Sequence, residues 1–336
     1  MDAVPKDMDS LHPATPYTGA RLQDGRFMNS SGRQARGLRD VLRWKIRGTP
    51  EPWPRTVPAD PAPPPVERML EAGIRATVIG HATVLVQVAG LNLLTDPVWS
   101  NRVGPTSWLG PRRVRPPAIA FDALPKIDAV LLSHNHYDHL DRPTLAALVE
   151  RDNPRIVTGL KVGKDVPSRQ VVELDWWQAS DLSADVQATY VPAEHFSART
   201  LFDRNRTLWG GFVVTTPSGP LYFAGDTGAG EHFSQIRHRF GPMALSLLPI
   251  GAYEPRWFMA PVHIGPDEAV AAAATLESRV TIAIHFGAFP LADDGMEAPV
   301  HGLGRALADR PDRRIDFRVP RFGFPILVPP DGDGGE

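Results

Sequence analysis

Short runs of apolar residues, rich in Val, Ile, Leu and aromatic side chains, recur along the chain from Ile74 onward. Apolar runs of this kind, bounded by polar and turn-forming residues, are typical of buried strands. The pattern predicts strands at residues 76–88, 91–94, 129–132, 156–159, 171–174, 186–191, 212–216, 221–224, 245–249 and 280–284.

A helical spacing of apolar residues appears between these runs. It predicts helices at residues 142–150, 231–240, 266–277 and 298–308. The third of these starts with Pro266, Asp267 and Glu268, which suit a helix N-terminus because proline fits the first turn and acidic groups complement the helix dipole. Strands interleaved with helices predict an α/β architecture of several layers, with sheets packed together and helices outside.

The first 70 residues have a different composition. Prolines at positions 50, 52, 54, 58 and 61 and a triplet at 63–65 favour an extended, helix-free path for the second half of this segment. We therefore predict an N-terminal arm at residues 1–70 and one larger domain at residues 71–330.

A basic amphipathic helix is predicted inside this arm, at residues 32–47. It places Leu38, Val41, Leu42 and Ile46 on one face, with six Lys and Arg side chains around them. Such a helix can lie on an anionic membrane surface. The alternative is a short helix that docks on its own domain, and the sequence leaves both open.

Composition narrows the class of protein. A net charge of -2 over 336 residues leaves no basic footprint, so we do not expect nucleic acid as a partner. The absence of cysteine excludes disulfides, thiolate metal ligands and a cysteine nucleophile. No signal segment and no run of eighteen apolar residues is visible, so we expect a soluble, cytoplasmic protein that is peripheral to the membrane if its arm binds lipid.

The segment Ser133-His-Asn-His-Tyr-Asp-His139 carries the clearest chemical signal, because it follows directly on a predicted buried strand. In an extended chain side chains alternate between the two faces, so His134 and His136 should point to the same face. Asp138 and His139 lie further round the turn and could hold a second ion. Nitrogen and carboxylate ligands without sulfur suit Zn²⁺ but also Mn²⁺ or Fe²⁺, with zinc the first expectation. Histidines satisfied by hydrogen bonds in a polar loop are the alternative.

Further ligands are expected at the ends of later strands, where active-site residues of layered α/β folds gather. One His or Asp follows each of three predicted strands. We expect one ion at His134, His136 and His195, a second at Asp138, His139 and His285, and Asp226 as the bridge between them. Two adjacent cations can hold a shared hydroxide and lower the pKa of its parent water towards neutrality.

This His-x-His-x-Asp-His pattern, with the three later ligands in the same order, resembles the metallo-β-lactamase superfamily. Within it the chain looks most like the branch that contains the N-acylphosphatidylethanolamine-hydrolysing phospholipase D. The similar segments include Gly80-His-Ala-Thr-Val-Leu-Val86, Leu94-Thr-Asp-Pro97, Leu174-Asp-Trp-Trp177, Trp209-Gly-Gly-Phe212, Gly225-Asp-Thr-Gly228 and Ile250-Gly-Ala-Tyr-Glu-Pro-Arg-Trp-Phe-Met259. The resemblance runs from Ala76 to Phe324.

The resemblance implies a four-layer αβ/βα sandwich with a dinuclear centre, normally zinc, at one edge between two sheets. It carries the family's metal ligands over to the seven residues named above. It also assigns His263 to substrate handling, although Val262 stands where the animal enzymes have a glutamine. We expect Asp138 and His263 to take part in catalysis.

The expected function is therefore a dinuclear, zinc-dependent hydrolase that cleaves a phosphodiester by attack of a metal-bridging hydroxide. The substrate would be a phospholipid of the N-acylphosphatidylethanolamine type or another small molecule, with peripheral membrane contact through the N-terminal arm. A lactonase of the L-ascorbate-6-phosphate type is the enzymatic alternative, and a non-catalytic metal-binding scaffold is the other. The sequence leaves the oligomeric state open.

Overall fold

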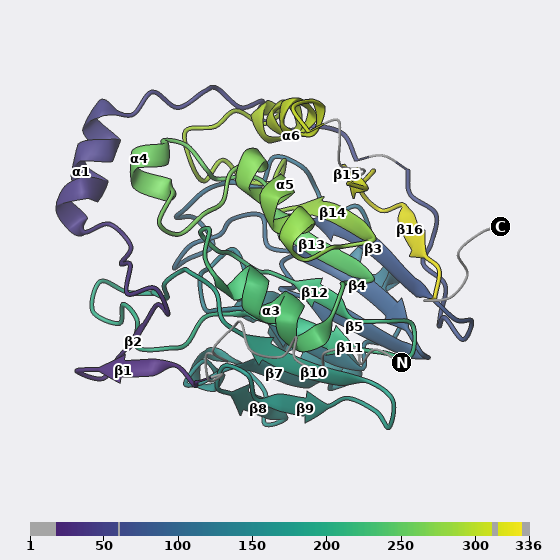
Figure 1. Ribbon diagram of the computed structural model, residues 1–336. Coiled ribbons are helices and arrows are strands. Elements are labelled where there is room, and N and C mark those ends of the chain that lie inside the picture. Colours follow the sequence, from purple (N-terminus) through teal and green to yellow (C-terminus); the bar gives the residue numbers. More distant parts are fainter. Residues whose placement is uncertain (1–17, 60, 311–314, 331–336) are drawn as a thin grey trace, which may run out of the picture.

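Two seven-stranded β-sheets pack face to face, and helices cover their outer faces (Figure 1). This arrangement comes from a computed structural model that describes residues 18–59, 61–310 and 315–330. The expected four-layer αβ/βα sandwich is confirmed.

The first sheet has the strand order β16-β3-β4-β5-β6-β7-β8. Strands β5 to β8 run parallel, whereas β16, β3, β4 and β5 pair antiparallel. Its strands are β3 (Ile74–Gly80), β4 (Thr83–Val88), β5 (Leu91–Thr95), β6 (Ala129–Leu132), β7 (Arg155–Gly159), β8 (Val171–Leu174) and β16 (Pro325–Val328).

The second sheet has the order β15-β14-β13-β12-β11-β10-β9, with β12 to β15 parallel and the rest antiparallel. Its strands are β9 (Ala179–Asp181), β10 (Gln187–Val191), β11 (Gly211–Thr215), β12 (Leu221–Phe223), β13 (Leu245–Pro249), β14 (Val280–Ile284) and β15 (Phe317–Arg318). The parallel strands of each sheet all direct their carboxyl ends to one edge, which is where polar side chains can converge.

Helices connect the parallel strands and shield the sheets from water. They are α2 (Arg142–Asp152), α3 (His232–Phe240), α4 (Arg256–Met259), α5 (Pro266–Thr275) and α6 (Ala298–Ala308), with two short 3₁₀ turns at Phe121–Ala123 and Gly163–Asp165. Central strands such as β4, β6, β13 and β14 are buried along their whole length. Burial on both faces explains why these strands appear in the sequence as continuous apolar runs without alternation.

One predicted strand is wrong in its extent. The run at residues 76–88 forms two antiparallel strands, β3 and β4, joined by a tight turn at His81 and Ala82. His81 has a φ of 54° there, in the left-handed region that turns require. Both strands are mainly apolar and buried, and only the short break at Gly80 and His81 separates them in the sequence.

The N-terminal arm begins with a hairpin of β1 (Arg21–Gln23) and β2 (Arg26–Met28), followed by helix α1 (Leu38–Arg47). From Gly48 to Leu70 the described residues contain neither helix nor strand, as the proline content predicts. This segment lies on the larger domain, since Glu51 N donates to Asp293 O and Val57 N donates to Val114 O. The predicted division of the chain at residue 70 stays a prediction. In the part of the chain that the structure describes, no helix has the length and apolarity needed to cross a bilayer.

Candidate metal centre

The seven predicted ligands come from loops at the ends of strands in both sheets. The loop after β6 supplies His134, His136, Asp138 and His139. Beyond β10, β12 and β14 lie His195, Asp226 and His285. His285 follows β14 directly and has a φ of 60°, in the left-handed region. The chain therefore changes direction at His285, where the strand ends. The fold thus collects residues that are up to about 150 positions apart in the sequence.

Asp226 lies at the centre of this group. Its Oδ2 is 3.1 Å from His139 Nε2 and its Oδ1 is 3.0 Å from His285 Nε2. The same Oδ2 lies 3.7 Å from His195 Nε2 and 4.0 Å from His134 Nε2. The two oxygens of one carboxylate therefore face histidines from both predicted sites.

Two sets of four ligand atoms lie within 4.8 Å of one another. One set is His134, His136, His195 and Asp226, and the other is His81, Asp138, His139 and His285. In the first set, His136 Nδ1 is 2.8 Å from His134 Nε2 and 3.2 Å from His195 Nε2. Nitrogens that share one tetrahedral zinc ion, at Zn–N distances near 2.0 Å, lie about 3.3 Å apart. The spacing of these three nitrogens matches that geometry.

Several polar atoms in the cluster are buried without a hydrogen-bond partner among the described residues. They include Asp226 Oδ1, His139 Nε2 and His285 Nε2. Asp226 Oδ1 lies 3.0 Å from His285 Nε2 and Asp226 Oδ2 lies 3.1 Å from His139 Nε2, yet neither pair is aligned for hydrogen bonding. Buried polar atoms without partners are costly, and a cation placed between them would satisfy them. The residues present therefore fit a metal ion.

The ionisation of the cluster supports the same conclusion. Burial and the neighbouring His195 lower the pKa of His136 to about 3, which keeps this imidazole neutral and able to bind metal. Burial would raise the pKa of Asp226, but His139, His285 and His263 outweigh it and hold the pKa well below the usual range. Burial lowers the pKa of His285, but Asp226 and Asp138 overcome it and raise the pKa to about 9. The carboxylates thus attract positive charge into the pocket.

Asp96 orients one of the ligands from behind. It is fully buried at the end of β5, and its Oδ2 accepts a hydrogen bond from His139 Nδ1 at 2.6 Å. Its Oδ1 also accepts from Ser133 N at 2.7 Å. A carboxylate on the far nitrogen fixes the tautomer and the ring direction of a metal-binding histidine. Sequence reasoning gave Asp96 no role, although its position directly after a predicted strand could have identified it.

His81 supports Asp138 in a similar way. From the turn between β3 and β4, its Nε2 lies 3.1 Å from Asp138 Oδ2, and its ring centre is 4.0 Å from that of His285. This contact lets His81 orient Asp138 from the turn.

The N-terminal arm also reaches the metal centre, which the sequence did not predict. Asn29 Oδ1 accepts hydrogen bonds from the backbone N–H of His195 at 3.0 Å and from Trp209 Nε1 at 2.9 Å. The adjacent Ser30 donates its hydroxyl to the buried carboxylate of Glu194 at 2.7 Å. The arm therefore holds both the Glu194 side chain and the backbone of His195.

His263 lies at the border of the cluster. Its Nδ1 is 3.9 Å from Asp226 Oδ2 and has no hydrogen-bond partner among the described residues. Burial lowers its pKa well below the ordinary value, so the ring is neutral. The preceding Val262 acts through its backbone, because its carbonyl accepts from His195 Nδ1 at 2.9 Å. Asp138 and His263 keep 15% and 13% of their side-chain surfaces exposed, so solvent reaches the cluster at these two residues, which we call the entrance of the metal centre.

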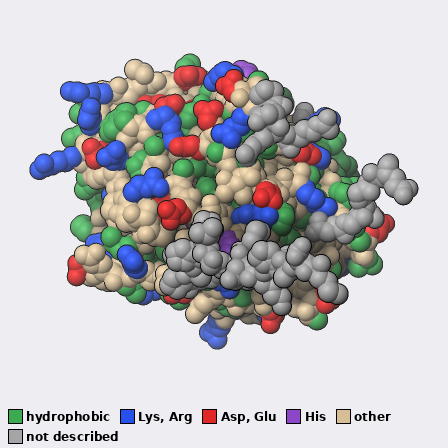
Figure 2. Space-filling view, in the orientation of Figure 1, with side chains coloured by type: hydrophobic (Ala, Val, Ile, Leu, Met, Phe, Trp, Pro, Cys, Tyr) green, Lys and Arg blue, Asp and Glu red, His purple; other side chains and the backbone are tan. Residues whose placement is uncertain are grey.

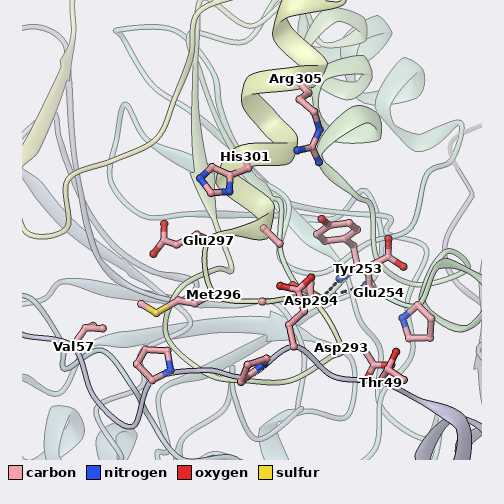
Figure 3. Close-up of a pocket in the computed structure, with 16 residues that line it drawn as sticks. Thr49, Val57, Tyr253, Glu254, Asp293, Asp294, Met296, Glu297, His301 and Arg305 are labelled. Atoms are coloured by element: carbon pink, nitrogen blue, oxygen red, sulfur yellow. Dashed lines mark hydrogen bonds between the residues drawn. The ribbon is translucent and has the colours of Figure 1, made fainter.

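A cavity of about 860 Å³ lies elsewhere, between the proline-rich segment and α6 (Figure 3). Its lining includes Tyr253, Glu254, Asp293, Glu297 and Arg305 but none of the seven predicted ligands. Asp294 at its base accepts backbone hydrogen bonds from residues 252–254, as the dashed lines show. This cavity is separate from the metal centre.

Comparisons with known proteins agree with the fold and place the chain in a family of hydrolases. A family model described as "Beta-lactamase superfamily domain" matches residues 91–286. An uncharacterised protein of Mycobacterium tuberculosis is 39% identical over 277 residues, covering 79% of this chain and 73% of that protein. An N-acyl-phosphatidylethanolamine-hydrolyzing phospholipase D of Caenorhabditis elegans is 41% identical over 236 residues, 66% of each chain. The solved structure of Igni18, a metallo hydrolase of Ignicoccus hospitalis, superimposes with a TM-score of 0.58 at 19% identity, covering 76% of this chain and 97% of that one.

Proposed function

The chain belongs to the beta-lactamase superfamily as a metallo-hydrolase, and we propose that it cleaves a phosphodiester bond with two metal ions, zinc by first choice. His134, His136 and His195 hold one ion in this proposal, and Asp138, His139 and His285 hold the other. Asp226 bridges them. Bound ions would act as Lewis acids toward phosphoryl oxygens and lower the pKa of water towards neutrality.

The central position of Asp226 carries this proposal. Its two carboxylate oxygens face histidines of both sets, and Oδ1 is buried without a hydrogen-bond partner in the described chain. Surrounding histidines hold its pKa low, so the carboxylate is ionised at neutral pH. A single structural ion would need only one of the two sets of four ligands. Two ions bridged by the Asp226 carboxylate explain why two such sets lie side by side.

The more exposed residues act on the substrate and on water. Asp138 is ionised because its histidine neighbours, against the effect of burial, hold its pKa well below the usual range. We propose that its carboxylate accepts a hydrogen bond from the attacking water and orients it. His263 faces the same space with a free ring nitrogen, from which the neutral ring can donate a hydrogen bond to a phosphoryl oxygen.

The relative from Caenorhabditis elegans suggests the substrate class. We propose a phospholipid with an N-acylated head group, because that enzyme's name states this substrate and 41% of the aligned residues are shared. Such a substrate resides in a bilayer, so we expect a cytoplasmic protein that reaches the membrane through its N-terminal arm.

Metal analysis and hydrolysis assays test the proposal. The purified protein should carry about two ions per chain and hydrolyse bis(p-nitrophenyl) phosphate as well as N-acylphosphatidylethanolamine in mixed micelles. His263→Ala should lower kcat by about 100-fold or more if the ring donates this hydrogen bond, with metal content unchanged. Turnover of a simple lactone but of neither phosphodiester would favour the lactonase. No turnover by metal-loaded protein would favour the scaffold.

A further inference from the structure

Helix α1 contacts the larger domain through one side only. Trp44 is buried, and its ring stacks on Phe258 of α4 at a centroid distance of 4.8 Å. Leu38, Leu42 and Ile46 point away from this contact, with 71%, 62% and 72% of their surfaces exposed. The helix therefore docks on its own domain through Trp44, and its apolar stripe faces solvent.

The charges on α1 flank this stripe on both sides. At about 100° per residue, Leu38, Leu42 and Ile46 span roughly 80° of the helix surface. Arg39 and Lys45 follow at roughly 60° on either side of Leu42. Figure 2 shows Lys and Arg side chains with hydrophobic side chains between them at the upper left of the molecule, where Figure 1 places α1. An apolar stripe bordered by cations is typical of a helix that lies in a membrane interface.

Two segments that contact α1 or the residues just before it also expose large apolar side chains. Trp257 of α4 is 39% exposed and lies under the Arg43 guanidinium at 4.9 Å. Leu201 and Phe202, at 80% and 82%, are at the tip of a loop. Arg204 of that loop donates to Ala35 O at 2.6 Å and to Arg36 O at 2.9 Å, just before α1. We call these six exposed residues the docking face: Leu38, Leu42, Ile46, Leu201, Phe202 and Trp257.

The same segments lead to the metal centre. The loop that carries Phe202 begins at Phe196, whose ring lies 4.5 Å from that of His136. It also holds Tyr137, because Tyr137 donates its hydroxyl to Arg199 O at 2.7 Å. Helix α4 with Trp257 precedes His263 by a few residues. The docking face and the entrance to the metal centre thus belong to connected loops.

Charge decides which partner suits the docking face. Large apolar side chains grouped on a surface indicate an interaction site. In a symmetric dimer the docking face would meet the same face of a second copy. The cations of the two copies would then lie close together and repel one another. These cations are Arg36, Arg39, Arg43, Lys45 and Arg47. The single acid of α1, Asp40, can balance only one of these five cations. An anionic surface with an apolar interior satisfies both the cations and the stripe.

We propose that the docking face binds the surface of an anionic lipid bilayer, with its apolar side chains in the interface and the surrounding cations on the head groups. This orientation presents the entrance of the metal centre to the lipid. Its relevance to substrate delivery rests on the proposed function, but lipid binding itself needs no hydrolysis.

Flotation of the full chain with vesicles tests the proposal. Vesicles of phosphatidylcholine alone are compared with vesicles that also contain phosphatidylglycerol. Neither lipid has the N-acylated head group of the proposed substrate, and flotation reports binding rather than hydrolysis. We expect binding to the anionic vesicles that weakens as salt is raised. Leu42→Gln with Ile46→Gln should weaken it at least about tenfold, because two apolar anchors are lost.

A charge variant and a matched control complete the experiment. Arg39→Gln with Lys45→Gln should weaken binding to anionic vesicles by roughly fivefold for each cation removed. Leu327→Gln makes the same chemical change at another exposed leucine, on β16 at the other side of the molecule, and should bind like the wild type. The proposal would be overturned if the wild-type protein does not bind anionic vesicles. It would also be overturned if the double variant Leu42→Gln with Ile46→Gln binds them as strongly as the wild type. A wild-type dimer that this double variant turns into a monomer without vesicle binding would overturn it in favour of a second copy.

Discussion

The metal centre and the docking face depart from the usual distribution of side chains in opposite directions. At the metal centre, charged and polar side chains such as Asp226, His139 and His285 are buried. At the docking face, large apolar side chains such as Leu42 and Phe202 are exposed. In a folded protein most polar side chains are exposed and most large apolar side chains are buried. A buried polar cluster and an exposed apolar patch are the two informative exceptions, since each costs free energy unless a partner is present.

The comparison teaches that the two regions lack partners of different kinds. The metal centre needs positive charge, as the raised pKa of His285 indicates. The docking face already carries positive charge and needs an apolar, anionic partner. The metal centre is held by strands of both sheets, whereas the docking face is on a ten-residue helix, a short helix and a loop. Substitutions should therefore affect metal and stability in the first region and lipid binding alone in the second.

The largest effect should come from Asp226→Ala at the metal centre. Loss of the bridge removes a ligand from both proposed sites, so metal content should fall from about two ions per chain to one or none. Hydrolysis should fall by more than the roughly 100-fold seen when a supporting residue behind a ligand is lost. Elemental analysis and a phosphodiester assay measure both. Asp122→Ala, which removes an exposed carboxylate, is the control. Full metal content in Asp226→Ala would show that this residue is not the bridge.

A smaller loss is expected from Asp96→Asn. The amide is close in size, but it can no longer balance charge on His139 through the 2.6 Å contact. Metal affinity should fall by roughly 10–100-fold, as measured by competition with a chelating indicator. Asp294→Asn is the matched control, because Asp294 is also a buried, hydrogen-bonded carboxylate but lies at the separate cavity. Equal metal affinity in the two variants would exclude a specific role for Asp96.

Asn29 tests whether the arm belongs to the metal centre or only to the docking face. Asn29→Ala leaves the buried N–H of His195 without its acceptor, which should lower the free energy of unfolding by about 1–3 kcal/mol. Metal affinity should fall as well, because His195 loses its support. Asn29→Asp keeps an acceptor oxygen and should restore much of the metal affinity. If metal affinity stays at the wild-type level in Asn29→Ala, the contact serves stability alone.

The layered fold and the candidate ligands could both be predicted from the sequence, because each depends on residues that are close together in the chain. Buried parallel strands appear as apolar runs, and a His or Asp placed directly after such a run lies at the edge where strand ends meet. The structure brings His195, Asp226 and His285 together in the way this rule predicts. Their role as metal ligands stays a prediction that the metal analysis above decides.

Other features depend on contacts that leave no local pattern. Asn29 is 166 positions from His195, so the hydrogen bond between them cannot be recognised from spacing. The turn at His81 is buried between two strands, and the short Gly80-His81 break does not distinguish it from one continuous strand. The periodicity of α1 revealed an apolar stripe, but Trp44 on the opposite side determines how the helix docks. In each case a tertiary contact decides the outcome.

The smallest effect on the fold is expected at the docking face itself. Leu42→Gln with Ile46→Gln should change the free energy of unfolding by no more than about 0.5 kcal/mol, because both side chains are exposed and glutamine is a good helix former. Trp44→Ala on the same helix should instead speed hydrogen exchange of the α1 amides, since it removes the ring stacked on Phe258. Equally fast exchange in the Gln double variant would mean that the stripe is packed in solution, and the contrast between the two regions would then disappear.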